Sequence, residues 1–233
     1  MDKVVLKSLE DLIKELSIFE NEKDIFPLFR GQSGSFPLLP SICRKNYKDD
    51  TTSIEKKMLT ELKRRNSSVN NFNLNDDWDW LVFAQHFGLK TRLLDWTSNP
   101  LTALWFACNE TFLKNKNAFM YAFLITDDLI LNRSKSEDPF NAGKTRVFKP
   151  NLNNPRIIAQ AGWFTAHKYS ASTKQFVSLE RNNDFKSNII EYEVPHGLQK
   201  SILKKLNILG INSQTLFPDA TGLCNQINWE FDY

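Results

Sequence analysis

The densest group of side chains able to do chemistry lies in the segment AQHFGLKTRLLDWTSNP, residues 84–100. Here a guanidinium, Arg92, and a carboxylate, Asp95, stand three positions apart. A guanidinium fixed by a carboxylate is what a phosphate or carboxylate clamp needs, and Asp95 could hold either Arg92 or Arg30. A buried ion pair that only joins two helices would give the same pattern. The polar candidates of this segment are Gln85, His86, Thr91, Arg92 and Asp95.

A second candidate is the segment FRGQSGS, residues 29–35, which contains Arg30 and Gln32. Arg30 follows apolar residues, so it is expected to leave the end of a buried strand. The glycines and serines after it would let the backbone approach a ligand and offer N–H groups to an anion. The segment is neither a GxGxxG nor a Walker loop, so a plain strand-to-turn exit is an equal alternative.

A third candidate is the pair Glu191 and Glu193, two positions apart in the alternating segment NIIEYEVP, residues 188–195. On a strand, these carboxylates share one face, roughly 6.5–7 Å apart. Paired carboxylates can serve acid–base or oxocarbenium chemistry. The polar outer face of an ordinary strand would look the same in sequence.

Metal and nucleophile chemistry have little support. No histidine stands at ligand spacing from another histidine or a cysteine, so no metal site is predicted. The three cysteines are far apart, which predicts neither a disulfide framework nor a zinc ribbon, and there is no GxSxG. The acids that a nuclease would use are better explained as a helix cap and a turn. These acids are Asp76, Asp77, Asp79, Asp127 and Asp128.

The composition is that of an ordinary globular protein. The chain has 233 residues, of which 41% are hydrophobic and 24% charged, and its net charge is +3. So small a charge does not by itself indicate nucleic acid as a partner, although it does not exclude one. The N-terminus lacks an apolar signal-peptide core, and no apolar run is long enough for a membrane helix. We therefore expect a soluble cytoplasmic protein that does not enter a membrane.

The elements that must position these residues predict an α+β fold in a single domain. Helices are expected mainly in the N-terminal half, packed on a mixed or antiparallel sheet from the C-terminal half. Residues 131–155 are polar and are expected to form a loop excursion, and residues 89–100 show no period. Helices are predicted over 8–19, 53–65, 76–88, 99–113 and 197–211. Strands are predicted over 24–31, 118–126, 156–167 (with a turn), 188–195 and, as a last short strand or loop, 215–219.

The strings FRGQ, LLPSICRK and WDWLVFAQHFGLKTRLLDWTSNPLTALWFACNE resemble the FRG domain family, named for its Phe-Arg-Gly. The signature blocks are residues 28–44 and 78–110. The resemblance continues through NPRIIAQAGWFTAH and LGINSQTLFPDATGL, with downstream blocks at 156–167 and 209–224, so one FRG-type domain is expected over 1–233. Departures are small: Lys90 replaces a common proline, and Ala220-Thr221 stand where Leu-Asp is common.

This resemblance implies a bacterial or phage protein, in a family that is mostly without assigned chemistry and often encoded near mobile or defence-type genes. A non-catalytic member would be a binding module of a defence or counter-defence system. The resemblance also implies a polar pocket for a small phosphate-containing ligand such as a nucleotide. The ligand-binding candidates are Arg30, Gln32, Gln85, Thr91, Arg92, Asp95, Gln160 and Thr165.

Two classes of function follow. The order of Arg30, Thr165 and the Glu pair is similar to the ADP-ribosyltransferase layout, which would make NAD the substrate. Arg30 would hold its phosphates, Thr165 would support the site, and Glu193 or Glu191 would stabilise the oxocarbenium-like ribose, with His86 as a further catalytic candidate. The alternative is a non-catalytic module for a nucleotide, an RNA end or a protein, in which Trp96 or Trp163 stacks on a base. A nuclease is a third option. The resident cofactor, if there is one, and any protein partner are left open.

Overall fold

A computed structural model describes residues 2–21, 24–66, 74–109, 115–132, 138–141, 143–152 and 154–232 of the chain. The strands are β1 (Asp2–Val5), β2 (Phe26–Gln32), β3 (Leu93–Thr97), β4 (Ala118–Ile125), β5 (Arg146–Phe148), β6 (Gly162–Ala166), β7 (Tyr169–Ser170), β8 (Gln175–Phe176) and β9 (Ile189–Val194). The α-helices are α1 (Leu9–Leu16), α2 (Thr52–Asn66), α3 (Asp77–His86), α4 (Pro100–Cys108), α5 (Pro155–Ala159), α6 (His196–Ile208), α7 (Ser213–Leu216) and α8 (Ala220–Glu230). Short 3-10 turns include η1 (Ser17–Asn21), η2 (Ser41–Cys43), η3 (Asp127–Leu129), η5 (Leu179–Arg181) and η6 (Lys186–Asn188).

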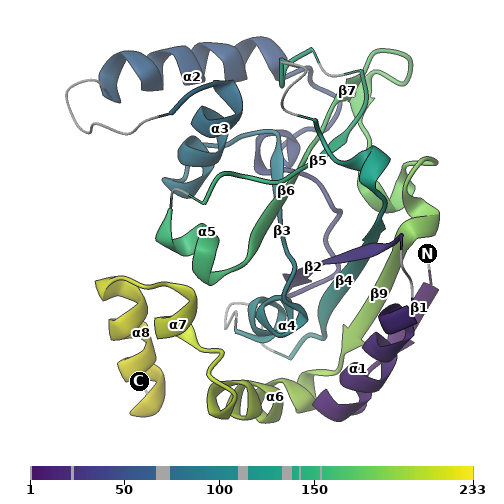
Figure 1. The fold of residues 1–233 in the computed structure, drawn as a ribbon, viewed down its shortest axis with the longest axis vertical. Helices are drawn as coiled ribbons and strands as arrows, with labels where there is room; N and C mark the ends of the chain where they lie inside the picture. Colours follow the sequence, from purple (N-terminus) through teal and green to yellow (C-terminus); the bar gives the residue numbers. More distant parts are fainter. Residues whose placement is uncertain are drawn as a thin grey trace.

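A seven-stranded sheet in the order β1-β9-β4-β2-β3-β6-β5 forms the centre of the molecule (Figure 1). The β1–β9 pair is parallel, and the other neighbouring pairs of this sheet are antiparallel. Most pairs share several register positions, but β2 and β3 are in register only at Phe29 and Thr97. The two central strands therefore separate on either side of this one position. A small hairpin of β7 and β8 stands apart from the sheet.

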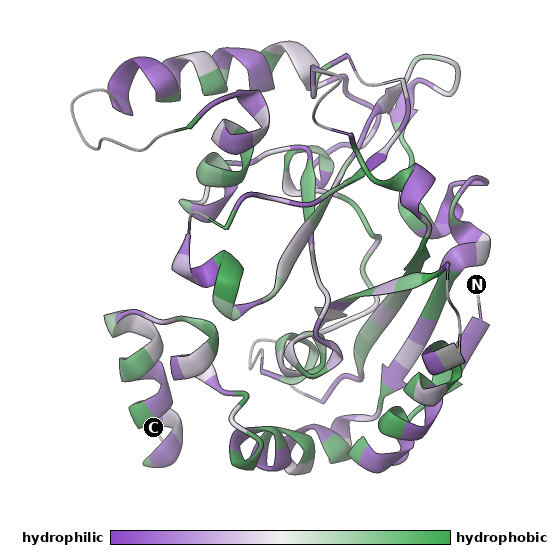
Figure 2. Cartoon of the chain, viewed as in Figure 1, coloured by the Kyte–Doolittle hydropathy of each residue, from purple (hydrophilic) through white to green (hydrophobic). Residues whose placement is uncertain are grey.

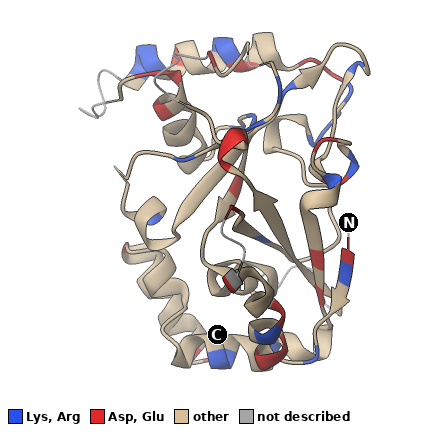
Figure 3. Ribbon diagram, turned by 45° about the vertical axis from the view of Figure 1, so that its right-hand side comes forward, with Lys and Arg blue, Asp and Glu red and all other residues tan. Residues whose placement is uncertain are grey.

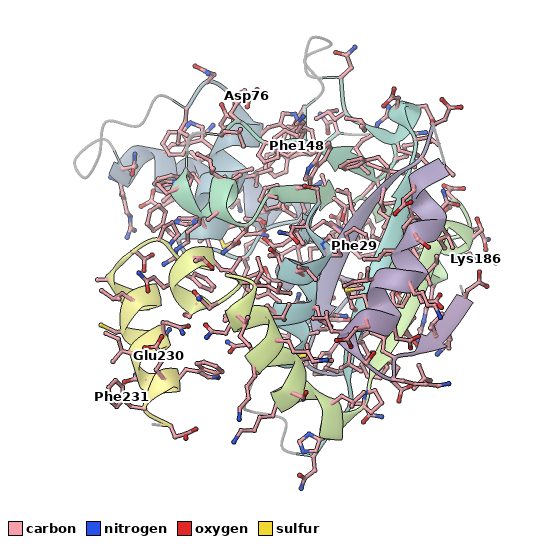
Figure 4. The ribbon with its side chains drawn as sticks, turned by 60° about the horizontal axis from the view of Figure 1, so that its bottom comes forward. Phe29, Asp76, Phe148, Lys186, Glu230 and Phe231 are labelled. Atoms are coloured by element: carbon pink, nitrogen blue, oxygen red, sulfur yellow. The ribbon has the colours of Figure 1, made fainter. Side chains whose placement is uncertain are left out.

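The two faces of the sheet are covered differently. On the helix-covered face, Phe29, Met120 and Tyr192 pack with buried residues of α1, α4 and α6. Further along the same face, α2 and α3 bury residues against the β3, β5 and β6 end of the sheet. On the loop-covered face, residues of β2, β3, β4 and β6 pack under η5 and η6 through Leu179 and Phe185. Figure 4 shows Phe29 inside the molecule, while Glu230 and Phe231 lie at its edge.

Local sequence explains where the helices beside the site begin. The side chain of Asn99 accepts from the N–H groups of Leu101 and Thr102, and Pro100 occupies the first turn of α4. Asp76 caps α3 in the same way by accepting from the N–H of Asp79. Helix α4 lies directly on β2 at Gly31, where a Cβ atom would come within 1.9 Å of the carbonyl oxygen of Ala103. Glycine at this position is therefore a condition of the close α4–β2 packing.

The α+β class, with a mixed sheet, is confirmed. The expected division between the two halves differs from the structure, because β1, β2 and β3 come from the N-terminal half and α6, α7 and α8 from the C-terminal half. The aperiodic segment 89–100 contains β3, whose residues are buried on both sides except Asp95 and so show no alternation. The expected loop excursion at 131–155 contains β5 in its described part.

Two further elements differ from their predictions. The segment 156–167 begins with the single-turn helix α5 and only then continues as β6. The last segment forms the short helix α7 and the longer helix α8 instead of a strand or loop at 215–219. The side chains of Asn212 and Asp219 cap the N-termini of these two helices. Such capping residues are a local sequence signal for a helix, and the strand interpretation did not use it. Helix α4 ends at Cys108, and residues 110–113 of its predicted extent lie outside the described residues.

The surface is mixed in polarity and charge. Figure 2 shows apolar residues concentrated on the strands and on inward sides of the helices, whereas α2 is largely hydrophilic. Figure 3 shows lysine and arginine interspersed with aspartate and glutamate, with both signs along α2 and little charge on α8. Within the described parts of the chain, no helix combines the length and apolarity needed to span a membrane.

Candidate functional site

A cavity of about 340 Å³, here called the central pocket, opens on the helix-covered face where β2 and β3 separate. Its volume falls in the range of pockets that bind small molecules. Strands β2, β3 and β6 form its floor, and α3, α4 and α5 contribute its walls. Its apolar lining includes Phe29, Phe106, Ile157, Phe164 and Phe217. Its polar lining includes Arg30, Gln85, His86, Asp95, Arg156 and Gln160.

Arg30 has both a supporting position and access to the pocket. Its Nη1 donates to the main-chain oxygen of Asp95 at 2.8 Å, in the place where a ladder hydrogen bond between β2 and β3 is missing. The same atom lies 3.7 Å from Oδ2 of Asp95. The Arg30 side chain is 14% exposed and that of Asp95 is 61% exposed. The carboxylate therefore projects into solvent, whereas the guanidinium is largely buried. Of the two partners considered for Asp95, Arg92 and Arg30, the structure shows the pair with Arg30.

A short relay of hydrogen bonds orients Asp95 from its other side. Nε2 of Gln85 donates to Oδ1 of Asp95 at 2.6 Å, and the hydroxyl of Thr91 donates to Oε1 of Gln85. Thr91 is fully buried and also accepts from the N–H of Leu93 at 3.2 Å. Thr91 therefore stands behind the pocket and fixes the amide of Gln85, which in turn fixes the carboxylate. Thr91 and Gln85, two of the predicted ligand-binding residues, thus form a chain of hydrogen bonds that ends at a third, Asp95.

His86 ends α3 at the rim of the central pocket. Its half-buried position lowers the pKa of the imidazole, and the positive charge of Arg156 lowers it further, while Asp219 acts in the opposite direction. The ring is therefore neutral at pH 7, and it can accept a proton or a hydrogen bond from a ligand. Its edge-to-face contact with Phe87, with ring centroids 4.8 Å apart, limits its orientation.

Arg156 is a member of the pocket that the sequence analysis did not select. Its Nε and Nη2 donate to Oδ2 of Asp219 at 3.0 and 2.6 Å, and its guanidinium lies 5.1 Å from the ring centroid of Phe217. Asp219 uses its other oxygen to cap α8 by accepting from the N–H of Gly222. The sequence feature that could have identified Arg156 is its place in the downstream block 156–167, where it is the one arginine or lysine.

Gln160 lines the pocket and links two of its walls. Its Nε2 donates to the carbonyl oxygen of Leu216 at 3.0 Å, which ties the end of α5 to α7. The main-chain oxygen of Gln160 accepts from the hydroxyl of Thr97 at 2.6 Å. The amide is thus held in place by the scaffold rather than left to rotate.

Arg92, which was predicted to bind ligand, is a buried structural residue outside the pocket lining. Its Nε donates to Oε2 of Glu55 at 2.8 Å, and both side chains are 2% exposed. It also donates to the carbonyl oxygen of Pro139 and the hydroxyl of Thr52, and it packs 4.7 Å from the ring centroid of Phe140. Its partner is Glu55, 37 positions earlier, and the structure does not pair it with Asp95.

Thr165 and Gln32 also lie outside the pocket lining. The hydroxyl of Thr165 accepts from Nε1 of Trp96 at 3.1 Å and lies 3.1 Å from Nε2 of His167, in a fully buried network. Nε2 of Gln32 donates to the carbonyl oxygen of Phe36 at 3.0 Å and so supports the turn after β2. Trp96, considered above as a stacking platform, is only 3% exposed, and its indole N–H is engaged by Thr165.

Glu191 and Glu193 lie on β9, which β4 separates from β2. They share one face of the strand, as predicted, but it is the loop-covered face, opposite to the central pocket. Glu191 is buried and forms an ion pair with Lys3 at 2.9 Å. Glu193 accepts from Nδ2 of Asn117 at 2.5 Å. The structure therefore does not bring these two carboxylates into the pocket that Arg30 lines.

No group of three or more potential metal-ligating side chains occurs within the described ranges. The central pocket thus offers donors and acceptors of a different type: two guanidinium groups, two amides, one carboxylate and one neutral imidazole. Such a set can bind an anion and, beside it, hydroxyl or amino donors.

One of the comparisons with known proteins matches a segment that contributes part of this pocket. Residues 27–116 match the profile of the FRG domain. Searches of the curated proteins and of the solved structures gave no significant match. The matched segment includes Arg30, Gln85, His86 and Asp95, all of which line the pocket. The resemblance recognised in the sequence is therefore confirmed for residues 27–116, the part of the chain that matches the FRG domain.

Proposed function

We propose that the protein binds a small ligand with a phosphate group and a hydroxyl- or amino-bearing part, of the size of a mononucleotide, in the central pocket. The observation that carries this proposal is the convergence of Arg30, Asp95, Gln85, His86 and Gln160 from four elements on one cavity. Five of the predicted site residues, chosen without the structure, line the same 340 Å³ space.

Each part of such a ligand has a matching group. Arg156, 31% exposed, and Arg30 provide cations for the phosphate, since a guanidinium presents several donors in a fixed geometry. Asp95 is held by Gln85 and Arg30 with its carboxylate exposed, so it can accept from a ribose hydroxyl or a base amino group. Phe106 and Phe217 supply an apolar wall for the remainder. Each of the two cations stands beside a carboxylate, Arg30 beside Asp95 and Arg156 beside Asp219. A ligand with hydroxyl or amino donors as well as a phosphate matches both charges, so such a ligand is favoured over inorganic phosphate alone.

Thermal unfolding with AMP, ADP, NAD and inorganic phosphate tests the proposal. A ligand at 100 times its dissociation constant adds about 2.7 kcal/mol of stability, which raises the Tm by roughly 5–10 °C for a chain of this size. We expect this shift with a nucleotide and its loss in Arg156→Gln. The matched control is Arg64→Gln on α2, which removes the same charge from another arginine–carboxylate pair outside the pocket. Equal shifts in both variants, or no shift with any of the four compounds, would refute the proposal.

The variant Asp95→Asn tests recognition of the hydroxyl- or amino-bearing part of the ligand separately from recognition of its phosphate. It keeps an acceptor oxygen near Gln85 but removes the negative charge, so nucleotide binding should weaken more than phosphate binding. An equal loss for both would assign Asp95 to the scaffold.

The enzymatic alternative can be tested with the same samples. Because Glu191 and Glu193 do not line the pocket, we expect NAD to bind without release of nicotinamide. Nicotinamide release by the wild-type protein, abolished in Glu193→Gln, would instead support ADP-ribosyltransferase-like chemistry. The bacterial or phage origin, the link to defence systems and the extension of the FRG domain over the whole chain stay predictions.

A further inference from the structure

A second, larger cavity of about 790 Å³ lies beside the β7–β8 hairpin, at the upper right in Figure 1. We call it the hairpin groove. It is lined by parts of the hairpin, by the segment leading to and following η5, by residues 143–145 and by Tyr47. None of its lining residues lines the central pocket, so the two cavities are separate sites.

The groove has an excess of positive charge. Lys144, Lys168 and Arg181 line it, and Asp184 is the one carboxylate among its described lining residues. Within the part of the chain that the structure describes, none of these three cations forms an ion pair with a carboxylate. The amine of Lys168 instead donates to the carbonyl oxygen of Gly143 at 2.7 Å. The cations are therefore available to an external anion.

The carboxylate next to Arg181 in sequence is turned away from the groove. Oε2 of Glu180 accepts from the N–H of Leu38 at 3.1 Å, and its Oε1 accepts from the hydroxyl of Ser178 at 2.6 Å. The first bond anchors η5 to the segment after β2, and the second is a local bond at the start of η5, so both oxygens are engaged. Glu180 is thus held by the scaffold and does not line the groove that Arg181 lines.

The walls of the groove are well anchored. The N–H of Phe176 donates to the carbonyl oxygen of Tyr47 at 2.7 Å, and Tyr169 packs edge-to-face on Phe176 with ring centroids 5.5 Å apart. The hydroxyl of Tyr169 donates to the carbonyl oxygen of Lys48 at 3.2 Å. These contacts fix the hairpin against the segment that carries Tyr47. The groove is therefore already formed before a ligand binds.

The remaining lining defines the class of ligand. Tyr47 is 41% exposed and offers an aromatic face at one side of the groove. Hydroxyl and amide side chains, among them Ser172, Thr173 and Asn183, provide uncharged donors and acceptors. Unpaired cations that follow a groove, together with an exposed aromatic ring, are the features with which proteins hold a phosphodiester backbone and stack a base.

We propose that the hairpin groove binds single-stranded nucleic acid, with Lys144, Lys168 and Arg181 contacting phosphates and Tyr47 stacking on a base. This site is independent of the ligand in the central pocket. Three phosphate contacts predict weak, salt-dependent binding, with log K falling against log salt concentration with a slope of about −2.

The test is fluorescence anisotropy of a labelled oligothymidylate titrated with the full chain at several salt concentrations. We expect binding at low salt with the slope given above, and a slope of about −0.7 in Lys144→Gln/Arg181→Gln, which retains one of the three contacts. The matched control is Lys200→Gln/Lys204→Gln, which removes the same charge from exposed positions on α6. Tyr47→Leu should weaken binding about ten-fold without changing the slope.

Three results would overturn the proposal: no anisotropy change at low salt, the same slope in the groove variant as in the wild type, or an equal change of slope in the α6 control. Polyglutamate of similar length serves as a competitor. If it displaces the oligonucleotide as well as unlabelled oligothymidylate does, the groove selects negative charge alone and not nucleic acid. Because none of these variants alters a residue lining the central pocket, nucleotide stabilisation there should persist throughout.

Discussion

Acidification from pH 7 to pH 5 should destabilise this protein through one buried side chain, His167. The residue is 1% exposed, and its Nε2 lies 3.1 Å from the hydroxyl of Thr165, which accepts from Nε1 of Trp96. Burial is the main cause that lowers the pKa of His167 to about 3, and the positive charges of Arg30 and Arg92 lower it further. The folded protein therefore keeps this imidazole neutral at pH 5.

The magnitude follows from proton linkage. The unfolded chain binds a proton at His167 below its ordinary pKa of about 6.5, whereas the folded chain does not until about pH 3. The stability due to the neutral ring is thus complete above pH 6.5 and declines as the pH falls from 6.5 towards 3. The loss is about 1.4 kcal/mol per pH unit, or about 2 kcal/mol at pH 5.

The assay is urea unfolding of the wild type and His167→Gln at pH 7 and pH 5. The glutamine keeps an acceptor near Thr165 but cannot titrate, so its free energy of unfolding should change with pH by about 2 kcal/mol less than that of the wild type. His196→Gln, at an exposed position, is the control that should follow the wild type. Carboxylates contribute equally to all three proteins and cancel in the comparison.

Equal pH dependence of His167→Gln and the wild type would refute the reasoning. If the variant does not fold, the proton resonances of the His167 ring in the wild-type protein decide the matter. They should stay at neutral values at pH 5, and a shift to the charged form above pH 5 would contradict a buried neutral ring.

Two further variants test the packing that supports the site. Gly31→Ala should destabilise the protein by more than about 3 kcal/mol or prevent folding, because its Cβ would lie 1.9 Å from the carbonyl oxygen of Ala103 and 2.4 Å from the amide nitrogen of Ala107. Gly197→Ala, with no atom within 4 Å of the added Cβ, is the control, and a similar loss in both would refute the contact. Glu55→Gln should lower the free energy of unfolding by about 3–5 kcal/mol because it leaves the buried charge of Arg92 unpaired. Glu61→Gln on the same helix, which removes only ion pairs at the surface, should have a much smaller effect, and a Glu55 effect equally small would show that the pair is dispensable.

The features of the fold that depend on neighbouring residues could be predicted from the sequence. The starts of α1, α3 and α4 were predicted because Ser8, Asp76 and Asn99 cap helices through bonds to residues two or three positions away. Strand β3 was missed because four of its five residues are buried, which removes the alternation that marks a strand. The C-terminal helices were missed because Pro218 and the aromatic Phe217 made the segment look like a strand or loop.

Prediction of the candidate site from the sequence is limited in the same way, because the role of a side chain depends on partners far away along the chain. Thr91 and Arg92 are adjacent, yet Thr91 supports the pocket through Gln85, whereas Arg92 pairs with Glu55 away from it. No local pattern distinguishes these roles, because the partner of Arg92 is 37 positions away, on helix α2. Arg156 was missed for a related reason, since only the fold brings α5 beside α3 and Asp219.

The central pocket and the support of the sheet depend on the same side chain. Because β2 and β3 meet in register only at Phe29 and Thr97, the sheet has a gap in its middle, and the central pocket lies beside that gap. Arg30 closes the gap with a hydrogen bond to the main chain of Asp95 while its charge remains at the pocket. Removing Arg30 would therefore weaken the sheet and the binding site together, and such a variant could not assign a function to either. Arg156 and Asp95 are the better probes, because the bonds they would lose are not part of the sheet.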